Sequence, residues 1–168
     1  MSDSTPVTQA LDSIGIPYRF FRHSGAVHSV EQAAQERGQL PDQVVRSILF
    51  RISQDHYLMV LAAGPHQISW PTLRSYMGQS RLTLARPDEV LQVTGFPIGA
   101  VSPFGLPNSM RVLVDRHVLD HAEISIGSGV RNTTVILQSQ DLLKALGNVE
   151  IGDFVEDKTT PDDSQEKG

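Results

Sequence analysis

The chain has 168 residues and a mass of 18.4 kDa, with 39% apolar residues, 20% charged residues and a formal net charge of −5. This length predicts one globular domain with a well-buried core. The acidic balance argues against a protein that coats nucleic acid through a wide basic face, and the absence of cysteine excludes disulfides and thiolate chemistry. The chain shows no signal peptide and no apolar run near the ~18 residues that span a membrane, so we expect a cytoplasmic protein without membrane contact.

Five helices are predicted along the chain, because each candidate has recognisable end signals. Thr5 followed by Pro6 begins the first helix, and Ser29 begins the second, which Gly38 ends. Glycine also follows the later candidates. The predicted helices cover residues 6–14, 30–37, 69–77, 87–94 and 139–146.

Short runs of β-branched and aromatic residues predict strands between these helices. The predicted strands cover residues 18–22, 44–52, 56–62, 81–85, 111–115, 123–126 and 133–137. Irregular alternation with hairpin-length links predicts an α+β domain around a mixed, mostly antiparallel sheet. We expect residues 1–155 to form this one domain. Residues 156–168 contain almost no apolar side chain and are expected to be a disordered tail.

One basic residue, Arg46, interrupts the longest predicted strand. Burying a guanidinium costs several kcal/mol unless a polar or anionic group receives it. Arg46 therefore either pairs with an internal carboxylate, such as Asp115 or Glu123, or faces a polar cleft made for a ligand. Two loops of small residues downstream, 99–105 and 127–129, make the cleft an attractive interpretation.

The Gly127-Ser128-Gly129 loop nearly matches the glycine fingerprint of dinucleotide-binding proteins. That fingerprint requires a helix after the glycines, whereas the β-branched run 133–137 follows here. The loop is better interpreted as a tight turn with exposed backbone N–H groups, either as a plain hairpin or as a small anion-binding nest.

Two histidines, His117 and His121, have the i, i+4 spacing of metal ligands on a helix. The segment around them is short and polar, and no glutamate stands between them as the hydrolytic zinc motif requires. We therefore expect a surface connection and no metal or other cofactor. A metal hydrolase built on these histidines stays as a third hypothesis, which predicts loss of activity with chelator.

Several segments follow one another in an order that is more specific than any one of them. They are Asp42-Gln43-Val44-Val45-Arg46-Ser47-Ile48-Leu49, Thr94-Gly95-Phe96, Gly99-x-x-Ser102-Pro103-x-Gly105, Asp115, and Gly127-Ser128-Gly129-x-Arg131. With these segments the chain resembles the YbaK-like family, which includes the editing domain within prolyl-tRNA synthetases and its free-standing relatives. The resemblance covers roughly residues 5–155.

The resemblance implies a mixed, barrel-like sheet flanked by helices, and hydrolysis of the ester that joins a wrong amino acid to the 3′ end of a tRNA. Such editing is needed because one methylene changes binding by only about 1–3 kcal/mol in a synthetase pocket. No metal is implied. Water, or the substrate's own thiol in cysteine editing, attacks the carbonyl, and backbone N–H groups and a cation meet the developing oxyanion.

The resemblance also implies a set of site residues. The predicted catalytic residues are Arg46, Ser47, Gly99 and Ser102. The predicted substrate-binding residues are Phe21, His28, Pro103, Phe104, Gly105, Gly127, Ser128 and Gly129. The family carries lysine where Arg46 stands; arginine keeps the charge, but its planar fork is larger and cannot act as a base. Arg46 could serve in the same way, narrow the pocket, or abolish hydrolysis.

The expected partner is the acceptor end of a mischarged tRNA, recognised locally, and an aminoacyl-tRNA synthetase is a further candidate partner. The alternative to a trans-acting deacylase is a non-catalytic module that keeps the pocket for an amino acid, a nucleotide or a protein partner. A panel of mischarged tRNAs separates these hypotheses, because the module binds without hydrolysing.

Overall fold

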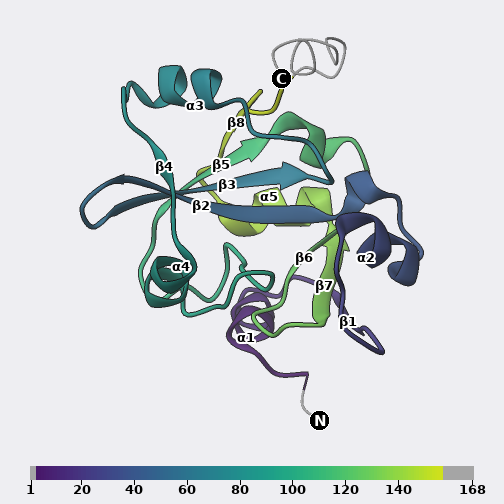
Figure 1. The fold of residues 1–168 in the computed structure, drawn as a ribbon. Helices are drawn as coiled ribbons and strands as arrows, with labels where there is room; N and C mark the ends of the chain where they lie inside the picture. Colours follow the sequence, from purple (N-terminus) through teal and green to yellow (C-terminus); the bar gives the residue numbers. More distant parts are fainter. Residues whose placement is uncertain (1–2, 157–168) are drawn as a thin grey trace.

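The computed structural model describes residues 3–156, in which helices cover both sides of a central β-sheet (Figure 1). The predicted tail, apart from Glu156, lies outside the described residues. In the described part of the chain, no helix has the length and apolar character needed to cross a membrane.

The five predicted helices are all present, and their end signals act as predicted. The side chains of Thr5, Ser29 and Ser69 each accept a hydrogen bond from the backbone N–H three residues later. Gly38 ends the second helix with a left-handed φ of 69°, which glycine adopts without strain. The helices are α1 (Pro6–Ser13), α2 (Val30–Arg37), α3 (Trp70–Met77), α4 (Pro87–Thr94) and α5 (Ser139–Leu146).

The strands form two sheets. The strands are β1 (Arg19–Arg22), β2 (Val45–Ser53), β3 (His56–Ala63), β4 (Thr83–Leu84), β5 (Arg111–Asp115), β6 (Glu123–Gly127), β7 (Thr133–Gln138) and β8 (Glu150–Gly152). The smaller sheet has the order β1-β7-β6 and is antiparallel; the larger has the order β4-β2-β3-β5-β8, with parallel pairing of β3 with β5 and of β5 with β8. The mixed α+β class is thereby confirmed.

The barrel-like closure implied by the resemblance does not occur in the described residues. The two sheets remain separate ladders, joined through an isolated parallel bridge between Val44 and Ser125. Strand β8 was not predicted, because three residues carry too little periodicity and their pairing with β5 depends on the tertiary fold. His117 lies in a 3-10 turn, Arg116–Leu119, at the end of β5, and His121 follows this turn.

Two hydrophobic clusters lie on opposite sides of the larger sheet. The main core includes Val7, Leu11, Val45, Leu49, Val90, Phe104, Ile126 and Leu142, and the second core includes Phe50, Leu58, Leu73 and Phe154. Figure 1 shows the corresponding arrangement, with α3 on one side of the β2–β3 hairpin and α1 and α4 on the other. Side chains of β2 contribute to both clusters. The direction of each β2 side chain therefore decides against which cluster it packs.

The alternation along β2 separates the two neighbouring residues of the predicted site. Val45 and Leu49 belong to the main core, whereas Ile48 packs against the second core. Because successive side chains of a strand point to opposite faces, Ser47 projects on the main-core side and Arg46 on the other.

Candidate active site

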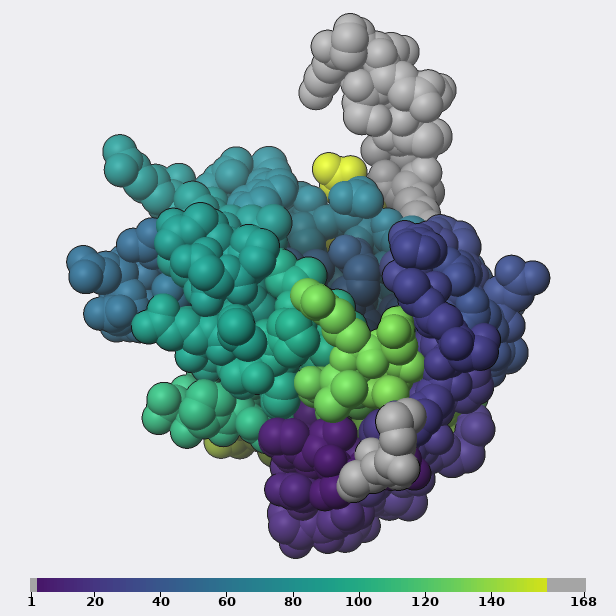
Figure 2. Space-filling view, turned by 60° about the horizontal axis from the view of Figure 1, so that its bottom comes forward, coloured from purple at the N-terminus to yellow at the C-terminus, as the bar shows by residue number. Residues whose placement is uncertain are grey.

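A cavity of about 460 Å³ lies where α2, the start of β2, the loop after α4 and the β6–β7 turn meet. Figure 2 shows the hollow between the dark blue α2 region, the teal loop and the green turn. Its size suits a small-molecule group or one end of a larger ligand. The lining residues are His23, Val27, Ser29, Val30, Ala33, Arg37, Val44, Val45, Arg46, Ser47, Ile98, Gly99, Val101, Ile126, Gly127, Arg131, Asn132, Thr133 and Thr134.

The charge of this lining differs in sign from that of the whole chain. Arg37, Arg46 and Arg131 line the cavity, and no Asp or Glu is among the lining residues of the described structure. The chain itself has a net charge of −5. A concave surface with positive charge and no carboxylate attracts an anionic ligand.

Within residues 3–156, Arg46 pairs with no interior acid. Its Nε donates to the carbonyl oxygen of Gly64 at 2.7 Å, and its Nη2 donates to the carbonyl oxygen of His66. The two carboxylates that the sequence offered have other partners: Asp115 accepts from the Phe154 amide, and Glu123 contacts Arg19. Of the two alternatives that the sequence left open, the internal ion pair is therefore not observed in residues 3–156, and burial lowers the pKa of Arg46.

Ser47 carries the most unusual polar group of the cavity. Its Oγ is buried and makes no hydrogen bond within the part of the chain described. Buried hydroxyl groups nearly always have a partner, so an exception calls for a water or a ligand. Since Ser47 lines the cavity, a ligand in the cavity can supply that partner.

The two predicted glycine loops lie directly against each other. The Gly129 amide donates to the carbonyl oxygen of Ala100 at 2.9 Å. A Cβ on Gly127 would overlap the carbonyl oxygen of Val101, so only glycine permits this approach. Gly127-Ser128-Gly129 joins two antiparallel strands, as the hairpin interpretation predicted. Gly99, with φ 93°, lines the cavity, and its amide has no hydrogen-bond partner among residues 3–156.

The second half of the first loop faces the protein interior instead of the cavity. Ser102 is fully buried, and its Oγ accepts from the Phe104 amide at 3.1 Å. Pro103 is buried, Phe104 packs in the main core, and Gly105 approaches the backbone of Pro6. These four residues were predicted to contact substrate, but none of them lines the cavity in the described structure, and Gly105 lies against the first residue of α1.

Four further predicted residues also lie outside the cavity lining. The Phe21 ring packs edge-on against His23 at 4.9 Å, and His28 is an exposed residue whose amide donates to Gln32. The Ser128 hydroxyl donates to the carbonyl oxygen of Val130 within the turn, and Gly129 packs close to Phe96. Of the predicted set, the structure brings Arg46, Ser47, Gly99 and Gly127 together at the cavity; their roles stay predictions.

The sequence interpretation missed the contribution of His23 and Arg37. Arg37 Nε donates to His23 Nε2 at 3.0 Å, and His23 Nδ1 lies 2.6 Å from the carboxylate of Glu36. A basic residue in the last turn of a helix is ordinary, and a single histidine has no local signal. The contact joins residues fourteen positions apart, so only the fold reveals it.

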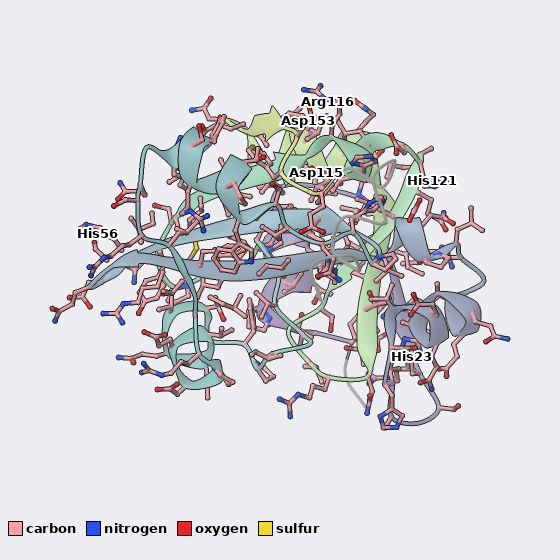
Figure 3. The ribbon with its side chains drawn as sticks, turned by 45° about the horizontal axis from the view of Figure 1, so that its top comes forward. His23, His56, Asp115, Arg116, His121 and Asp153 are labelled. Carbon is pink, nitrogen blue, oxygen red and sulfur yellow. The ribbon has the colours of Figure 1, made fainter. Side chains whose placement is uncertain are left out.

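The histidine pair shows no metal-binding arrangement. No group of three or more His, Asp or Glu side chains is placed to hold a metal ion within residues 3–156. His117 Nδ1 lies 2.8 Å from Asp115, and its ring stacks on that of His66. Figure 3 shows Asp115 and His121 on the upper side of the molecule, well away from His23 beside α2.

Comparison with known proteins adds an independent observation. The family model described as "Aminoacyl-tRNA editing domain" matches residues 24–145. The chain is 27% identical over 157 residues to the prolyl-tRNA editing protein ProX of Acetoanaerobium sticklandii, a match that covers 88% of this chain and 94% of that protein. It is 30% identical over 110 residues to the proline–tRNA ligase of Thermosipho melanesiensis, covering 66% of this chain but 19% of the ligase.

The fold has a counterpart among solved structures. A structure described as a "putative trans-editing enzyme for prolyl tRNA synthetase" superimposes with a TM-score of 0.84 and 24% identity. The match covers 94% of this chain and 99% of that one. At this identity the likeness establishes the shared architecture.

Proposed function

The chain belongs to the aminoacyl-tRNA editing domain family, whose model matches residues 24–145, and from this premise we propose that it hydrolyses the ester of a mischarged aminoacyl-tRNA in trans. The substrate is an amino acid attached to the 3′ end of a tRNA, and the products are the free amino acid and the free tRNA. Residues 1–155 act in this proposal as one editing domain.

The observation that carries the proposal is the unsatisfied polarity of the cavity. Within residues 3–156, the buried Ser47 hydroxyl has no hydrogen-bond partner, and the amide of Gly99, an exposed residue, has none either. An ester carbonyl accepts hydrogen bonds and becomes an oxyanion when water attacks it, so both donors suit it.

Charge stabilisation comes from Arg46 in this proposal. Its bonds to the carbonyl oxygens of Gly64 and His66 fix the guanidinium and leave Nη1 with no hydrogen bond to residues 3–156. The two carbonyls are neutral, so they orient the charge without cancelling it. Because the Arg46 side chain leaves β2 on the face opposite to Ser47, Arg46 takes the electrostatic role of the family's lysine in this proposal through its charge and not through a bond to the ester.

The described residues that line the cavity offer no unengaged general base. His23 is the histidine among the lining residues, and its Nε2 already accepts a hydrogen bond from Arg37. Catalysis therefore rests on positioning the ester and stabilising the oxyanion.

The proposal has consequences for partners and location. The acceptor end of the tRNA enters the cavity, and the positive lining suits its phosphates. Prolyl-tRNA synthetase is a candidate partner because several relatives are proline–tRNA ligases. A substrate made during translation places the protein in the cytoplasm.

The test is a deacylation assay with tRNAs that carry different amino acids. The wild-type protein should release at least one amino acid well above the spontaneous rate. Arg46→Ala should lower kcat/KM about 100-fold, as loss of an oxyanion-stabilising group does elsewhere, and Arg46→Lys should retain more activity. Arg116→Gln removes an exposed arginine on another face and should leave the rate unchanged.

Circular dichroism gives the folded fraction of each variant, to which rates are normalised. Binding of tRNA with no hydrolysis of any ester would refute the deacylase and establish the non-catalytic module instead. Equal rates for wild type and folded Arg46→Ala would remove Arg46 from the mechanism.

A further inference from the structure

The cavity contains a second guanidinium that the proposed chemistry does not use. Arg37 is the last residue of α2 and lines the cavity. Its Nε donates to His23 Nε2 at 3.0 Å, and its Nη1 donates to Ser125 Oγ at 2.8 Å. Its remaining nitrogen, Nη2, makes no hydrogen bond within the described chain.

His23 must be neutral to make this contact. A ring nitrogen that accepts from Arg37 carries no proton, so Nδ1 carries it and donates to Glu36 Oε1 at 2.6 Å. The other oxygen of Glu36 accepts from Gln32. The carboxylate next to Arg37 in the chain is thus engaged with other groups, and the guanidinium meets a neutral imidazole.

The second contact of Arg37, with Ser125, also has a defined donor and acceptor. Ser125 is fully buried, and its Oγ donates to Gln39 Oε1 at 3.0 Å, so the hydroxyl lone pairs are free to accept from Arg37. Gln39 Nε2 in turn donates to Glu123 Oε1 at 3.3 Å. In this series of hydrogen bonds each group donates to the next, ending at Glu123. The series therefore holds the guanidinium in one orientation.

The result is an oriented positive charge whose hydrogen-bond partners within residues 3–156 include no carboxylate; the neighbouring Glu36 raises the pKa of Arg37 by its charge, but its oxygens bind His23 and Gln32. Burial lowers the pKa of Arg37 to about 10, so the group stays protonated near neutral pH. Arginine at such a place is expected to pair with an acid, because desolvation of an unpaired charge is unfavourable. Here both hydrogen-bond partners, His23 and Ser125, are neutral. A bound anion would supply the negative charge that the guanidinium lacks as a partner.

We propose that Arg37 binds a phosphate group of the acceptor strand, adjacent to the nucleoside that carries the amino acid. The inference rests on the proposed function, since that substrate brings phosphates into the cavity with its terminal nucleoside. A guanidinium fork binds phosphate oxygens with charge-assisted hydrogen bonds. Exposed Arg131, whose Nε donates to the carbonyl oxygen of Ile98, adds positive charge on another wall.

The direct test measures binding of the trinucleotide CCA with a free 3′ hydroxyl, which needs no hydrolysis. Arg37→Gln should weaken binding at least 10-fold, and the slope of log Kd against log salt should fall by about 0.7, as expected for one lost phosphate contact on a single strand. Arg37→Lys should bind more weakly than wild type but keep the slope. Arg116→Gln should match wild type in both.

Kinetics separate a binding role from a structural one. With mischarged tRNA, Arg37→Gln should raise KM at least 10-fold with kcat nearly unchanged. With a 3′-aminoacyl-adenosine, which has no phosphate, the variant and wild type should have the same kcat/KM. A defect that is equally large on both substrates would overturn the phosphate assignment.

Failure of this inference differs from failure of the proposed function. If wild type hydrolyses ester while folded Arg37→Gln binds CCA with wild-type affinity and slope, the inference is wrong and the deacylase stands. If wild type hydrolyses nothing but the CCA result holds, the phosphate site stands and the deacylase falls. If Arg37→Gln does not fold, Arg37→Lys decides: unchanged affinity for CCA overturns the proposal.

Discussion

Charged side chains have different partners in the cavity and on the opposite face around β8. Near β8, Arg111 makes two hydrogen bonds of 2.7 Å to Glu150, and Arg116 pairs with Asp153 at 3.2 Å. Figure 3 shows Arg116 and Asp153 together on that side, far from His23. In the cavity, the hydrogen-bond partners of Arg37 among the described residues are neutral, and the Ser47 hydroxyl has no partner among them.

The difference shows which polar groups serve the fold and which are left for a ligand. Where charges pair with charges, the fold is locally complete and a ligand has nothing to add. Where buried donors lack partners, the folded state carries an unfavourable desolvation term that a bound anion or carbonyl can offset. Substitutions on the two sides should therefore affect stability and activity in opposite proportions.

The largest effect on stability is expected at Gly127, where the cavity wall has room for a glycine but not for a side chain. Gly127→Ala should reduce the free energy of unfolding by about 3 kcal/mol, because the added Cβ must displace the backbone of Val101. Urea unfolding measures the change. Gly25→Ala, where a Cβ meets nothing within 4 Å, should stay within about 0.5 kcal/mol of wild type; equal losses at both glycines would contradict the steric argument.

Asp115 tests the side of the molecule away from the cavity. Its carboxylate is fully buried and accepts from the amides of Phe154 and His117. Asp115→Ala should lower the free energy of unfolding by about 2 kcal/mol, since those donors lose their acceptor. The folded variant should bind CCA as wild type does. Exposed Asp120→Ala is the control, and a binding defect specific to Asp115→Ala would break the separation of the two sides.

A pair of serines gives the sharpest form of the comparison. Ser47→Ala should lower deacylation about 10-fold through loss of one hydrogen bond to the substrate, without lowering the free energy of unfolding. Ser139, whose Oγ donates to the carbonyl oxygen of His121 at 2.8 Å, should behave in the reverse way: Ser139→Ala loses about 1 kcal/mol of stability at unchanged activity. Deacylation rates and urea curves on both variants decide; the same pattern at both serines would refute the distinction.

The smallest effect is expected at the exposed pair of Arg111 and Glu150. Hydrogen bonds from Arg111 lower the pKa of Glu150 below its usual range. A carboxyl group with a lowered folded-state pKa stabilises the fold above its unfolded pKa, and the contribution disappears as pH falls through the folded-state value. Glu150→Gln should therefore cost less than about 1 kcal/mol at pH 7. The difference from wild type should fade below roughly pH 4, and a constant difference across pH would exclude this ion pair as its source.

The local sequence was sufficient for most secondary structure. Thr5, Ser29 and Gly38 predicted helix ends that the structure shows, because capping depends on groups within a few residues. β8 and the arrangement in two sheets were not predictable, since pairing in parallel strands is decided by distant segments. The loop 99–105 was assigned wholly to the site, although its second half packs inside.

The sequence by itself determined the family, the mixed α+β class and the presence of a charged residue in β2, because these follow from residue order and local patterns. The tertiary structure decided what each charge contacts. Arg46 meets two backbone carbonyls, and Arg37 is oriented by His23 and Ser125, the latter 88 positions away. Partners of buried charges come from segments brought together only when the core closes, so hydrogen bonding at the cavity is a property of the fold and not of any one segment.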